Sequence, residues 1–598
     1  MPNKSRLPTL PFPLIIHLLV GAVLPASAAP QGAEEPRSQP EYRIRTQINL
    51  KVPMRDGVNL AADVFRPDAP GKFPTLLLRS YHGTQGYMTM ALYFARRGYA
   101  VVMVDVRGRY DSDGEFEFYV YEPEDGYDTQ QWVAKQTWCN GKIGLFGHSY
   151  NGFTQLMPAP LQSPHVLCMI PSSCQQTNFG HIYNDGVLQL NVVITAGLFG
   201  SGRVLQPTIA GVYSGDPFID YDEIYRRLPL ITALDDIVEL PNVKKWIEHS
   251  TYDDYWKAHG IRDKYHLIQA PAFFINGWYG NLLLEGWKNL NGFRLQGGSA
   301  AAREGTKIIV GPWTHAVNRV DPDWPVDFGD TATYDGLDFH VRWYDHWLKG
   351  MDNGIGEEPP IKIFVMGANQ WRFENEWPLE RTRFTPFYLH SGGRANSLRG
   401  DGSLTADEPL PNAPTDGFVY DPENPVPTVG GRISTNPELQ GPRDRQALQE
   451  RQDILVYTSE PLQKDLEVTG PVELKLYAAS SAVDTDFTAA LSDVYPDGRA
   501  ILICEGIRRA SFRESLEHPT PIEPGKIYEY SISLWETSNV FKAGHRMRLE
   551  ISSSDFPRYA RNLNTGNRSG MSAEMLKARQ TIHHSARYPS RLVLPVIP

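Results

Sequence analysis

Uninterrupted apolar runs alternate with amphipathic stretches over the first part of the chain. The runs at 73–80 and 99–105 lack the every-second-residue alternation of a half-exposed strand and are typical of strands buried on both faces. Helical spacing of apolar residues is found at 88–97 and 122–135, and another apolar run lies at 142–146. Strands that alternate with amphipathic helices predict a parallel sheet covered by helices, which is an α/β fold.

The pattern changes twice further along the chain. Residues 175–261 contain helical stretches and Pro/Gly turns without buried strands, which predicts a helical cap inserted over the carboxyl edge of the sheet. The α/β pattern then resumes, so we expect one α/β domain to comprise residues 43–174 and 262–355. From 356 to 598 the strands are short and separated by turns, which predicts an all-β jelly-roll domain.

Residues 1–28 have the layout of a secretory signal peptide. Two basic residues precede an apolar run at 12–24, and Ala26-Ser27-Ala28 offers a small-residue cleavage site. We expect cleavage near Ala28, a mobile leader at 29–42 and a secreted or periplasmic protein with no membrane span in the mature chain. A retained membrane anchor is the alternative.

Composition excludes some classes of partner. The 598 residues carry a formal net charge of −11 with no long basic run, so nucleic acid is not an expected partner. Neither a Gly-rich phosphate loop nor an H-E-x-x-H motif is present, so we expect no metal and no cofactor. A homo-oligomer is possible. Of the four cysteines, Cys168 and Cys174 could form a disulfide or be small buried residues.

The candidate chemistry centres on the segment GLFGHSYNG at 144–152. Ser149 lies between glycines where an apolar strand runs into a helical stretch, the arrangement of a nucleophile elbow. The usual pattern is G-x-S-x-G, but here Asn151 takes the second glycine position and Gly152 follows it. The segment therefore predicts a nucleophilic serine, with an ordinary turn as the alternative.

Partners for this serine follow from the order of the predicted strands. The apolar run 307–310 leads into Gly-Pro-Trp-Thr-His, which places His315 in the loop after the last strand of the sheet, where α/β-hydrolases carry their general base. The backbone N–H of Tyr150 is one expected donor of the oxyanion hole. The second donor is expected from the loop after the strand that ends at Ser80, where Tyr81 either reaches the site or packs under the cap.

At this point the sequence resembles a known family. Residues 147–152 are similar to the G-x-S-Y-x-G signature of the cocaine-esterase and X-Pro dipeptidyl-peptidase group, which also includes α-amino-acid ester hydrolases and glutaryl acylases. Further similar segments follow in family order at 105–108, 138–142, 311–315, 342–347, 554–558 and 589–595. The resemblance implies Ser149 as nucleophile, His315 as base and Tyr81 as side-chain oxyanion donor. It also implies a helical cap and a C-terminal jelly roll.

One departure concerns the third member of the triad. The family places its aspartate in a G-W-[YF]-D segment, but here the corresponding segment 277–280 ends in Gly280. A triad acid orients the histidine and stabilises the imidazolium. The candidate replacements are Asn281 as a neutral orienting residue, or a displaced carboxylate such as Glu285. Three further carboxylates follow the histidine: Asp321, Asp323 and Asp327.

The sequence predicts an exported serine hydrolase that cleaves ester or amide bonds through an acyl-serine intermediate. One alternative is an X-Pro-type dipeptidyl-peptidase, which needs an acidic anchor for the substrate amine. The cap offers Asp216, Asp220, Asp222 and Glu223. The other alternative, kept open by Gly280, is a weakly active or non-catalytic binding protein on the same scaffold. The carboxylates with which amino-acid ester hydrolases bind a substrate ammonium are missing beyond Gly280, which argues against amino-acid esters.

Overall fold

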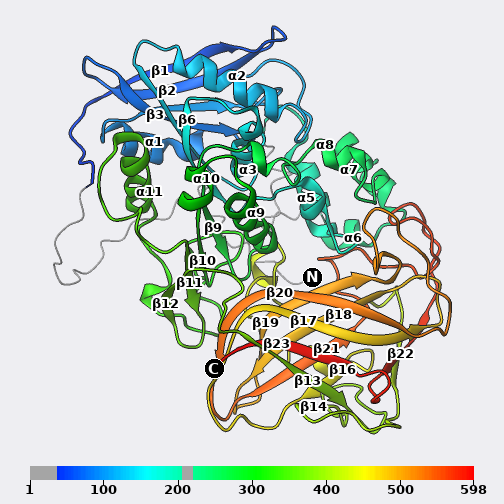
Figure 1. Cartoon of the computed structure of the whole chain (residues 1–598). Coiled ribbons are helices and arrows are strands. Elements are labelled where there is room, and N and C mark those ends of the chain that lie inside the picture. The colour runs from blue at the N-terminus through cyan, green and yellow to red at the C-terminus, as the bar shows by residue number, and fades with distance from the viewer. Residues whose placement is uncertain (1–36, 205–219, 435) are drawn as a thin grey trace, which may run out of the picture.

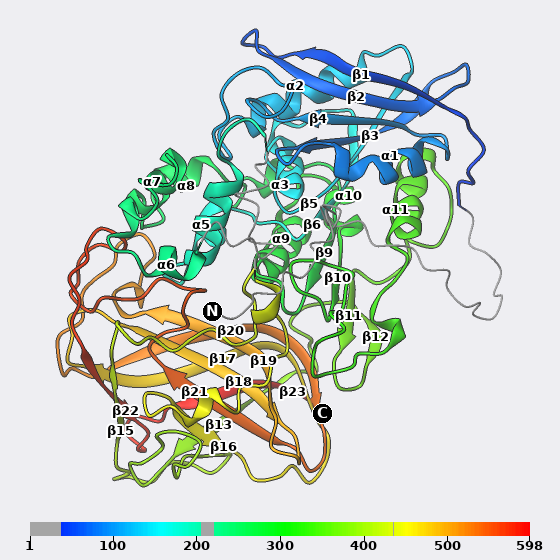
Figure 2. The ribbon, with the colours of Figure 1, turned by 180° about the vertical axis from the view of Figure 1, so that it is seen from behind.

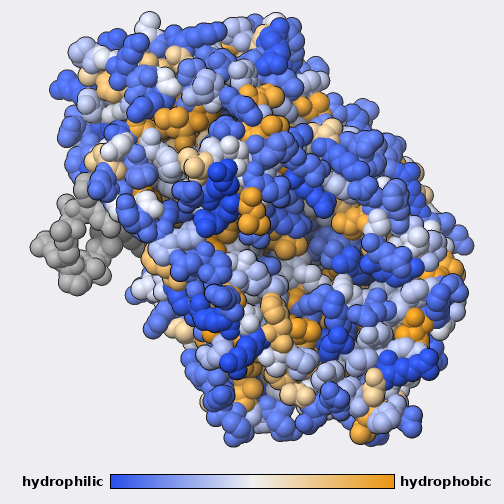
Figure 3. Space-filling model, viewed as in Figure 1, coloured by the Kyte–Doolittle hydropathy of each residue, from blue (hydrophilic) through white to orange (hydrophobic). Residues whose placement is uncertain are grey.

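The computed structural model describes residues 37–204, 220–434 and 436–598. The expected signal peptide, most of the expected leader and Asp216 lie outside these residues. Figures 1 and 2 show an α/β part and a C-terminal β domain, with the cap helices between them on one side. The face seen in Figure 3 is mostly hydrophilic, with its apolar residues scattered or in small groups.

The α/β part is built on a 10-stranded sheet. Its order is β1 (Ile44–Pro53), β2 (Asn59–Pro67), β4 (Ala100–Asp105), β3 (Phe73–Ser80), β5 (Cys139–His148), β6 (Val166–Ser172), β9 (Phe273–Gly277), β10 (Lys307–Gly311), β11 (Ile361–Val365) and β12 (Gln370–Glu374). Strands β4, β3, β5, β6, β9, β10 and β11 run parallel, whereas β1, β2 and β12 pair antiparallel.

Both faces of this sheet are covered. In β4, Val101 and Met103 pack into a core with α1 (Met88–Ala95) and α11 (Gly336–Tyr344). Val102 and Val104 point to the opposite face and share a core with α3 (Tyr150–Leu156) and two further helices. Those helices are α2 (Glu122–Ala134) and α9 (Leu283–Gln296). Because alternate residues enter two apolar cores, the central strands are apolar throughout.

The cap is mostly helical but contains a feature that the sequence pattern missed. It comprises α4 (Asn178–Ile182), α5 (Leu190–Phe199), α6 (Tyr221–Arg226), α7 (Pro241–Glu248) and α8 (Asp254–Ala258). Between α4 and α5 lies a buried hairpin of β7 (Tyr183–Asn184) and β8 (Val187–Leu188). Strands of two residues are too short to produce a periodic signal in a sequence.

The C-terminal domain is all-β, as expected, but the first two strands after its predicted start at 356 belong to the α/β sheet. Strand β11 pairs in parallel with β10, with Ile308 opposite Ile361, and β12 continues the α/β sheet. The second sheet contains β13 (Arg383–His390), β14 (Ser403–Thr405), β15 (Asp416–Tyr420), β16 (Leu455–Thr458), β17 (Leu466–Ser480), β18 (Asp486–Val494), β19 (Ala500–Arg509), β20 (Tyr528–Phe541), β21 (Arg546–Ser552), β22 (Ala578–His583) and β23 (Arg591–Ile597). The sequence of a short strand after a loop does not indicate which of two sheets the strand joins.

No helix among the described residues combines the length and the apolar character that crossing a bilayer requires. All four cysteines are buried and unpaired, Cys168 and Cys174 included.

Candidate active site

Ser149 lies between β5 and α3 with φ 59° and ψ −124°, a backbone conformation that non-glycine residues rarely adopt. The turn is possible because its neighbours are small. A Cβ on Gly147 would lie 2.5 Å from the carbonyl oxygen of Asn151, and one on Gly152 would lie 2.9 Å from Cys174 Cβ. Asn151 is accommodated because its amide donates to the Tyr87 hydroxyl at 2.7 Å. The altered spacing therefore still forms a nucleophile elbow.

His315 faces this serine from the loop after β10. Its Nε2 lies 3.0 Å from Ser149 Oγ, within hydrogen-bond distance. Burial lowers the pKa of His315 to about 4, and no carboxylate of the described residues offsets this effect. The ring is therefore neutral at pH 7, the form that can accept the serine proton.

The other nitrogen of His315 faces a residue that the sequence did not single out. His315 Nδ1 lies 3.1 Å from Ser173 Oγ. Ser173 is fully buried directly after β6, and its N–H donates to the carbonyl of Ile275 on the neighbouring strand β9 at 2.8 Å. When Nε2 accepts the Ser149 hydrogen, Nδ1 carries the ring proton and donates to Ser173.

Neither of the two predicted orienting residues forms a hydrogen bond with His315 in the structure. Glu285 Oε2 accepts the N–H of Gln176 at 3.1 Å, and its Oε1 accepts from Lys288 at 2.8 Å. Asn281 is buried, but neither its side-chain nitrogen nor its oxygen has a hydrogen-bond partner among the described residues. Glu285 and Asn281 follow the acid position in sequence, but closeness in sequence does not bring either of them into a hydrogen bond with His315.

The displaced aspartates do not replace the acid either. Asp321 lies 3.7 Å from the Arg443 guanidinium, Asp327 accepts the N–H of Gly329 at 2.8 Å, and Asp323 is exposed.

Gly280 itself lies at the place where an acid would be expected. A Cβ built there would be 3.1 Å from the carbonyl oxygen of Gly277 and 3.5 Å from that of Thr314, the residue before His315. The loop after β9 thus runs beside the histidine loop, but it presents no side chain at this position.

The two predicted oxyanion donors lie next to each other. Tyr150 is the first residue of α3, so its N–H has no partner within the helix. Its phenol is held elsewhere, because its hydroxyl donates to Glu122 Oε1 at 2.7 Å. The Tyr81 ring packs on the Tyr150 ring with centroids 4.6 Å apart and on the His82 ring at 3.7 Å. Tyr81 therefore lies beside the elbow and is also buried. This position is compatible with both alternatives for Tyr81, a place at the site and packing in the interior.

Three further histidines surround His315. The His148 ring lies 4.7 Å from the His315 ring, and burial together with the charges of His315 and His82 holds the pKa of His148 well below its usual value. Burial and neighbouring positive charge also lower the pKa values of His82 and His181 to about 3. None of these shifts involves a carboxylate among the described residues. The histidines beside the nucleophile are therefore neutral at pH 7.

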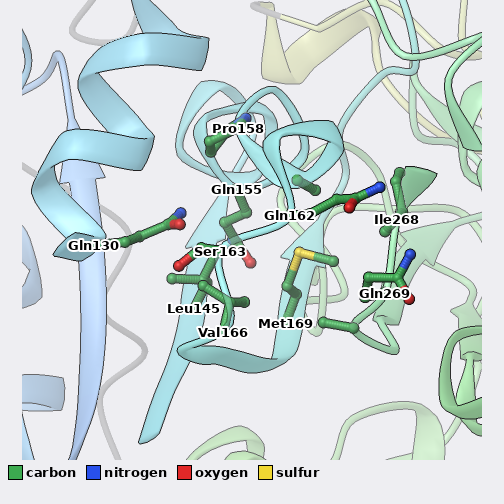
Figure 4. A pocket seen from close by; sticks show the side chains of 12 residues that line it. Gln130, Leu145, Gln155, Pro158, Gln162, Ser163, Val166, Met169, Ile268 and Gln269 are labelled. Atoms are coloured by element: carbon green, nitrogen blue, oxygen red, sulfur yellow. The ribbon is translucent and has the colours of Figure 1, made fainter. Parts of the chain in front are cut away.

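Figure 4 shows a small hollow elsewhere in the α/β part, lined by Gln130, Gln155, Gln162 and Gln269 among others. It lies beside the first residue of β6 and the segment before β9, at the opposite ends of these strands from the elbow. Its lining contains none of the catalytic candidates, so we do not assign the substrate to it.

No group of three or more His, Cys, Asp or Glu side chains in the described ranges has a geometry suited to a metal ion. The expectation of a cofactor-free enzyme stays a prediction.

A strained serine at a strand-to-helix turn, bonded to a half-buried histidine in the loop after β10, defines a serine hydrolase of the α/β-hydrolase fold. Comparison with known proteins agrees. Residues 56–317 match the X-Pro dipeptidyl-peptidase (S15) family, and residues 353–593 match the X-Pro dipeptidyl-peptidase C-terminal non-catalytic domain. The chain belongs to this family, as the resemblance predicted.

The chain is also similar to individual proteins of this family. The chain is 37% identical over 587 residues to cocaine esterase from Rhodococcus sp. (strain MB1 Bresler), covering 92% of this chain and 98% of that protein. It is 23% identical to a putative Xaa-Pro dipeptidyl-peptidase of Bacillus anthracis, covering 78% of this chain and 70% of that protein. An α-amino acid ester hydrolase structure superposes with a TM-score of 0.78 at 22% identity, covering 95% of this chain and 98% of that one. This protein is a serine hydrolase that acts on esters or peptides.

Proposed function

We propose that this protein is an exported esterase that cleaves carboxylic esters with an uncharged acyl group through an acyl-Ser149 intermediate. The observation that carries the proposal is the 3.0 Å contact between Ser149 Oγ and His315 Nε2 at a strained elbow. The similarity to cocaine esterase over most of both chains supports an ester rather than a peptide substrate.

The reaction follows from the positions of these groups. Ser149 Oγ attacks the ester carbonyl carbon while its proton passes to His315 Nε2, and the carbonyl oxygen becomes an oxyanion. The Tyr150 N–H and the Tyr81 hydroxyl donate hydrogen bonds to that oxyanion. The C–O bond to the alcohol then breaks, and the alcohol leaves with the proton from Nε2. Water repeats the same steps on the acyl-enzyme and releases the acid.

The neutral histidines around the nucleophile support the restriction to uncharged acyl groups. A substrate ammonium buried beside neutral histidines would lack a counter-ion, which is costly. The three described cap carboxylates that the sequence offered as amine anchors bond elsewhere or face solvent. Asp220 accepts the N–H of Glu223 at the start of α6, Glu223 pairs with Arg227, and Asp222 is exposed. Both ribbon views show α6 beside the β domain (Figures 1 and 2).

A matched pair of substrates tests the proposal. Methyl phenylacetate and phenylglycine methyl ester differ only in the α-amine, which is charged at about pH 6.5. We expect kcat/KM to favour methyl phenylacetate on the order of tenfold or more, because an unpaired buried ammonium costs over 1 kcal/mol. Gly-Pro-p-nitroanilide should be a poorer substrate still, and Ser149→Ala should abolish all three activities. Preference for either amine-bearing substrate would contradict the proposal, and preference for Gly-Pro-p-nitroanilide would favour the dipeptidyl-peptidase alternative.

Labelling with a fluorophosphonate separates weak activity from none. We expect a single adduct by intact mass in the wild type and no adduct in Ser149→Ala. An unlabelled wild type that hydrolyses no ester would favour the non-catalytic binding protein instead.

Export is proposed from residues 1–28 alone. Expression of the full chain in a Gram-negative host should give a periplasmic or secreted protein whose mass corresponds to a start near Ala29. A cytosolic protein of full-length mass would contradict export.

A further inference from the structure

We propose that Ser173 is the positioning residue of His315, so that this chain operates an uncharged Ser149–His315–Ser173 triad. The inference rests on the proposed function, because it concerns the same acyl transfer. It departs from the family pattern, in which a carboxylate holds the histidine.

The geometry makes Ser173 the partner of the histidine. The two nitrogens of His315 face two serine hydroxyls, Ser149 Oγ at 3.0 Å from Nε2 and Ser173 Oγ at 3.1 Å from Nδ1. Ser173 is itself fixed, since its side chain is fully buried and its N–H is bonded to the Ile275 carbonyl at 2.8 Å. Its φ of 44° lies in the left-handed region, so the loop holds it in a conformation that serine rarely adopts. The imidazole is therefore oriented from both sides.

A hydroxyl supplies part of what a carboxylate supplies. It accepts the Nδ1 proton, so the ring keeps the tautomer in which Nε2 is free to act as base. It brings no negative charge, so the imidazolium that forms during the reaction is stabilised less. Replacing a triad aspartate with a group that imposes the wrong tautomer costs about 10⁴-fold in kcat. Because Ser173 preserves the tautomer, we expect a smaller deficit here.

Three histidines of the described residues lie around His315. They are His148 from β5, His82 from the loop after β3 and His181 from α4. Burial lowers the pKa of His315 to about 4, and no carboxylate among the described residues offsets this shift. Protonated His315 cannot accept the Ser149 proton, so activity is lost as pH falls through this pKa. The acidic limb of the kcat/KM profile should therefore lie near pH 4, well below the usual histidine value of about 6.5.

The test compares four single variants and one double variant by their kcat/KM profiles from about pH 3.5 to pH 9. Ser173→Ala removes the acceptor. Ser173→Asn keeps an acceptor in a residue that tolerates positive φ. Gly280→Asp offers a carboxylate at the family's acid position, and Gly280→Asn is its uncharged control of the same size. Circular dichroism and thermal melting establish that each variant is folded.

We expect Ser173→Ala to lower kcat about 10- to 100-fold with little change in KM, and Ser173→Asn to retain more activity. Gly280→Asp should move the acidic limb upward toward about pH 6.5, whereas Gly280→Asn should leave it unchanged. In the double variant Ser173→Ala/Gly280→Asp, the carboxylate should restore much of the lost kcat.

Two results would overturn the inference. One is a Ser173→Ala variant with wild-type kcat and an unchanged acidic limb. The other is a folded Ser173→Ala variant whose lost activity is recovered neither by Ser173→Asn nor by Gly280→Asp, which would indicate a purely structural role. Failure of the proposed function is a different result, because there the wild type itself hydrolyses no ester and its Ser149 is not labelled.

Discussion

Asp105, at the end of β4, is a buried carboxylate whose ionisation should weaken the fold. Its side chain is 8% exposed and its Oδ1 has no hydrogen-bond partner among the described residues. Burial raises the pKa of Asp105 to about 7, and the nearby carboxylates of Asp63 and Asp111 raise it further, against the lowering effects of the Asp111 backbone N–H and of Arg109. The folded state therefore binds a proton that the unfolded chain releases at a much lower pH.

The sign and size of the effect follow from proton linkage. Where the folded state binds more protons than the unfolded state, stability falls as pH rises. With a pKa of about 7 in the folded state and 3.8 as the ordinary value, the wild type should lose about 3 kcal/mol of unfolding free energy between pH 5 and pH 8. Asp105→Asn does not titrate and should lose none of it. All other groups titrate in both proteins and cancel in the comparison.

Urea unfolding followed by tryptophan fluorescence measures this difference, using the transition in which esterase activity is also lost. Burying an asparagine amide has the same energetic cost at both pH values. The informative quantity is therefore the change, from pH 5 to pH 8, in the difference in unfolding free energy between Asp105→Asn and the wild type. Relative to wild type, Asp105→Asn should gain about 3 kcal/mol on going from pH 5 to pH 8. The exposed Asp68→Asn serves as control. An equal stability difference at both pH values would refute the reasoning.

Other predictions concern the elbow and the contact between domains. Tyr81→Phe removes the proposed oxyanion donor and should lower kcat about 10²- to 10³-fold in steady-state kinetics, with KM nearly unchanged. Gly152→Ala places a methyl group 2.9 Å from Cys174 Cβ and should slow fluorophosphonate labelling, whereas unchanged labelling would show that the turn has more room. Arg432→Met leaves Glu505 with one fewer buried partner and should cost about 3–5 kcal/mol in urea unfolding. A loss under about 1 kcal/mol would show that the pair is replaceable.

The central sheet was predictable because its strands carry a strong local signal. A strand such as β4, buried at every position, must be apolar along its whole length. The domain boundary was not predictable in the same way. Strand β11 is a short apolar segment after a loop, and only its pairing with β10 assigns it to the α/β sheet.

The residues of the site also differ in how strongly the local sequence indicates them. Ser149 and His315 each have a local signature, a glycine-flanked turn and a position after an apolar run, and the structure brings them to hydrogen-bond distance. Ser173 has only the signal that it follows a buried strand. Because neighbouring parallel strands end at one edge of the sheet, that position was a candidate in principle. A serine there is indistinguishable by sequence from any other serine at a strand end, and a hydroxyl is not the group expected to replace a triad carboxylate.

The loop that would carry the acid is still fully built in this protein. The Trp278 indole donates to the Phe364 carbonyl at 2.7 Å, and the Trp278 carbonyl accepts from Arg432 Nε of the β domain at 3.1 Å. The Tyr279 hydroxyl donates to the Leu502 carbonyl at 3.2 Å. These bonds fix the residues before Gly280 to β11 and to the β domain, whatever side chain position 280 carries. The loop therefore has a structural role that does not depend on the acid. A carboxylate restored at 280 would enter a loop already held beside His315, which is why a single substitution suffices to test whether charge was removed from an otherwise intact triad.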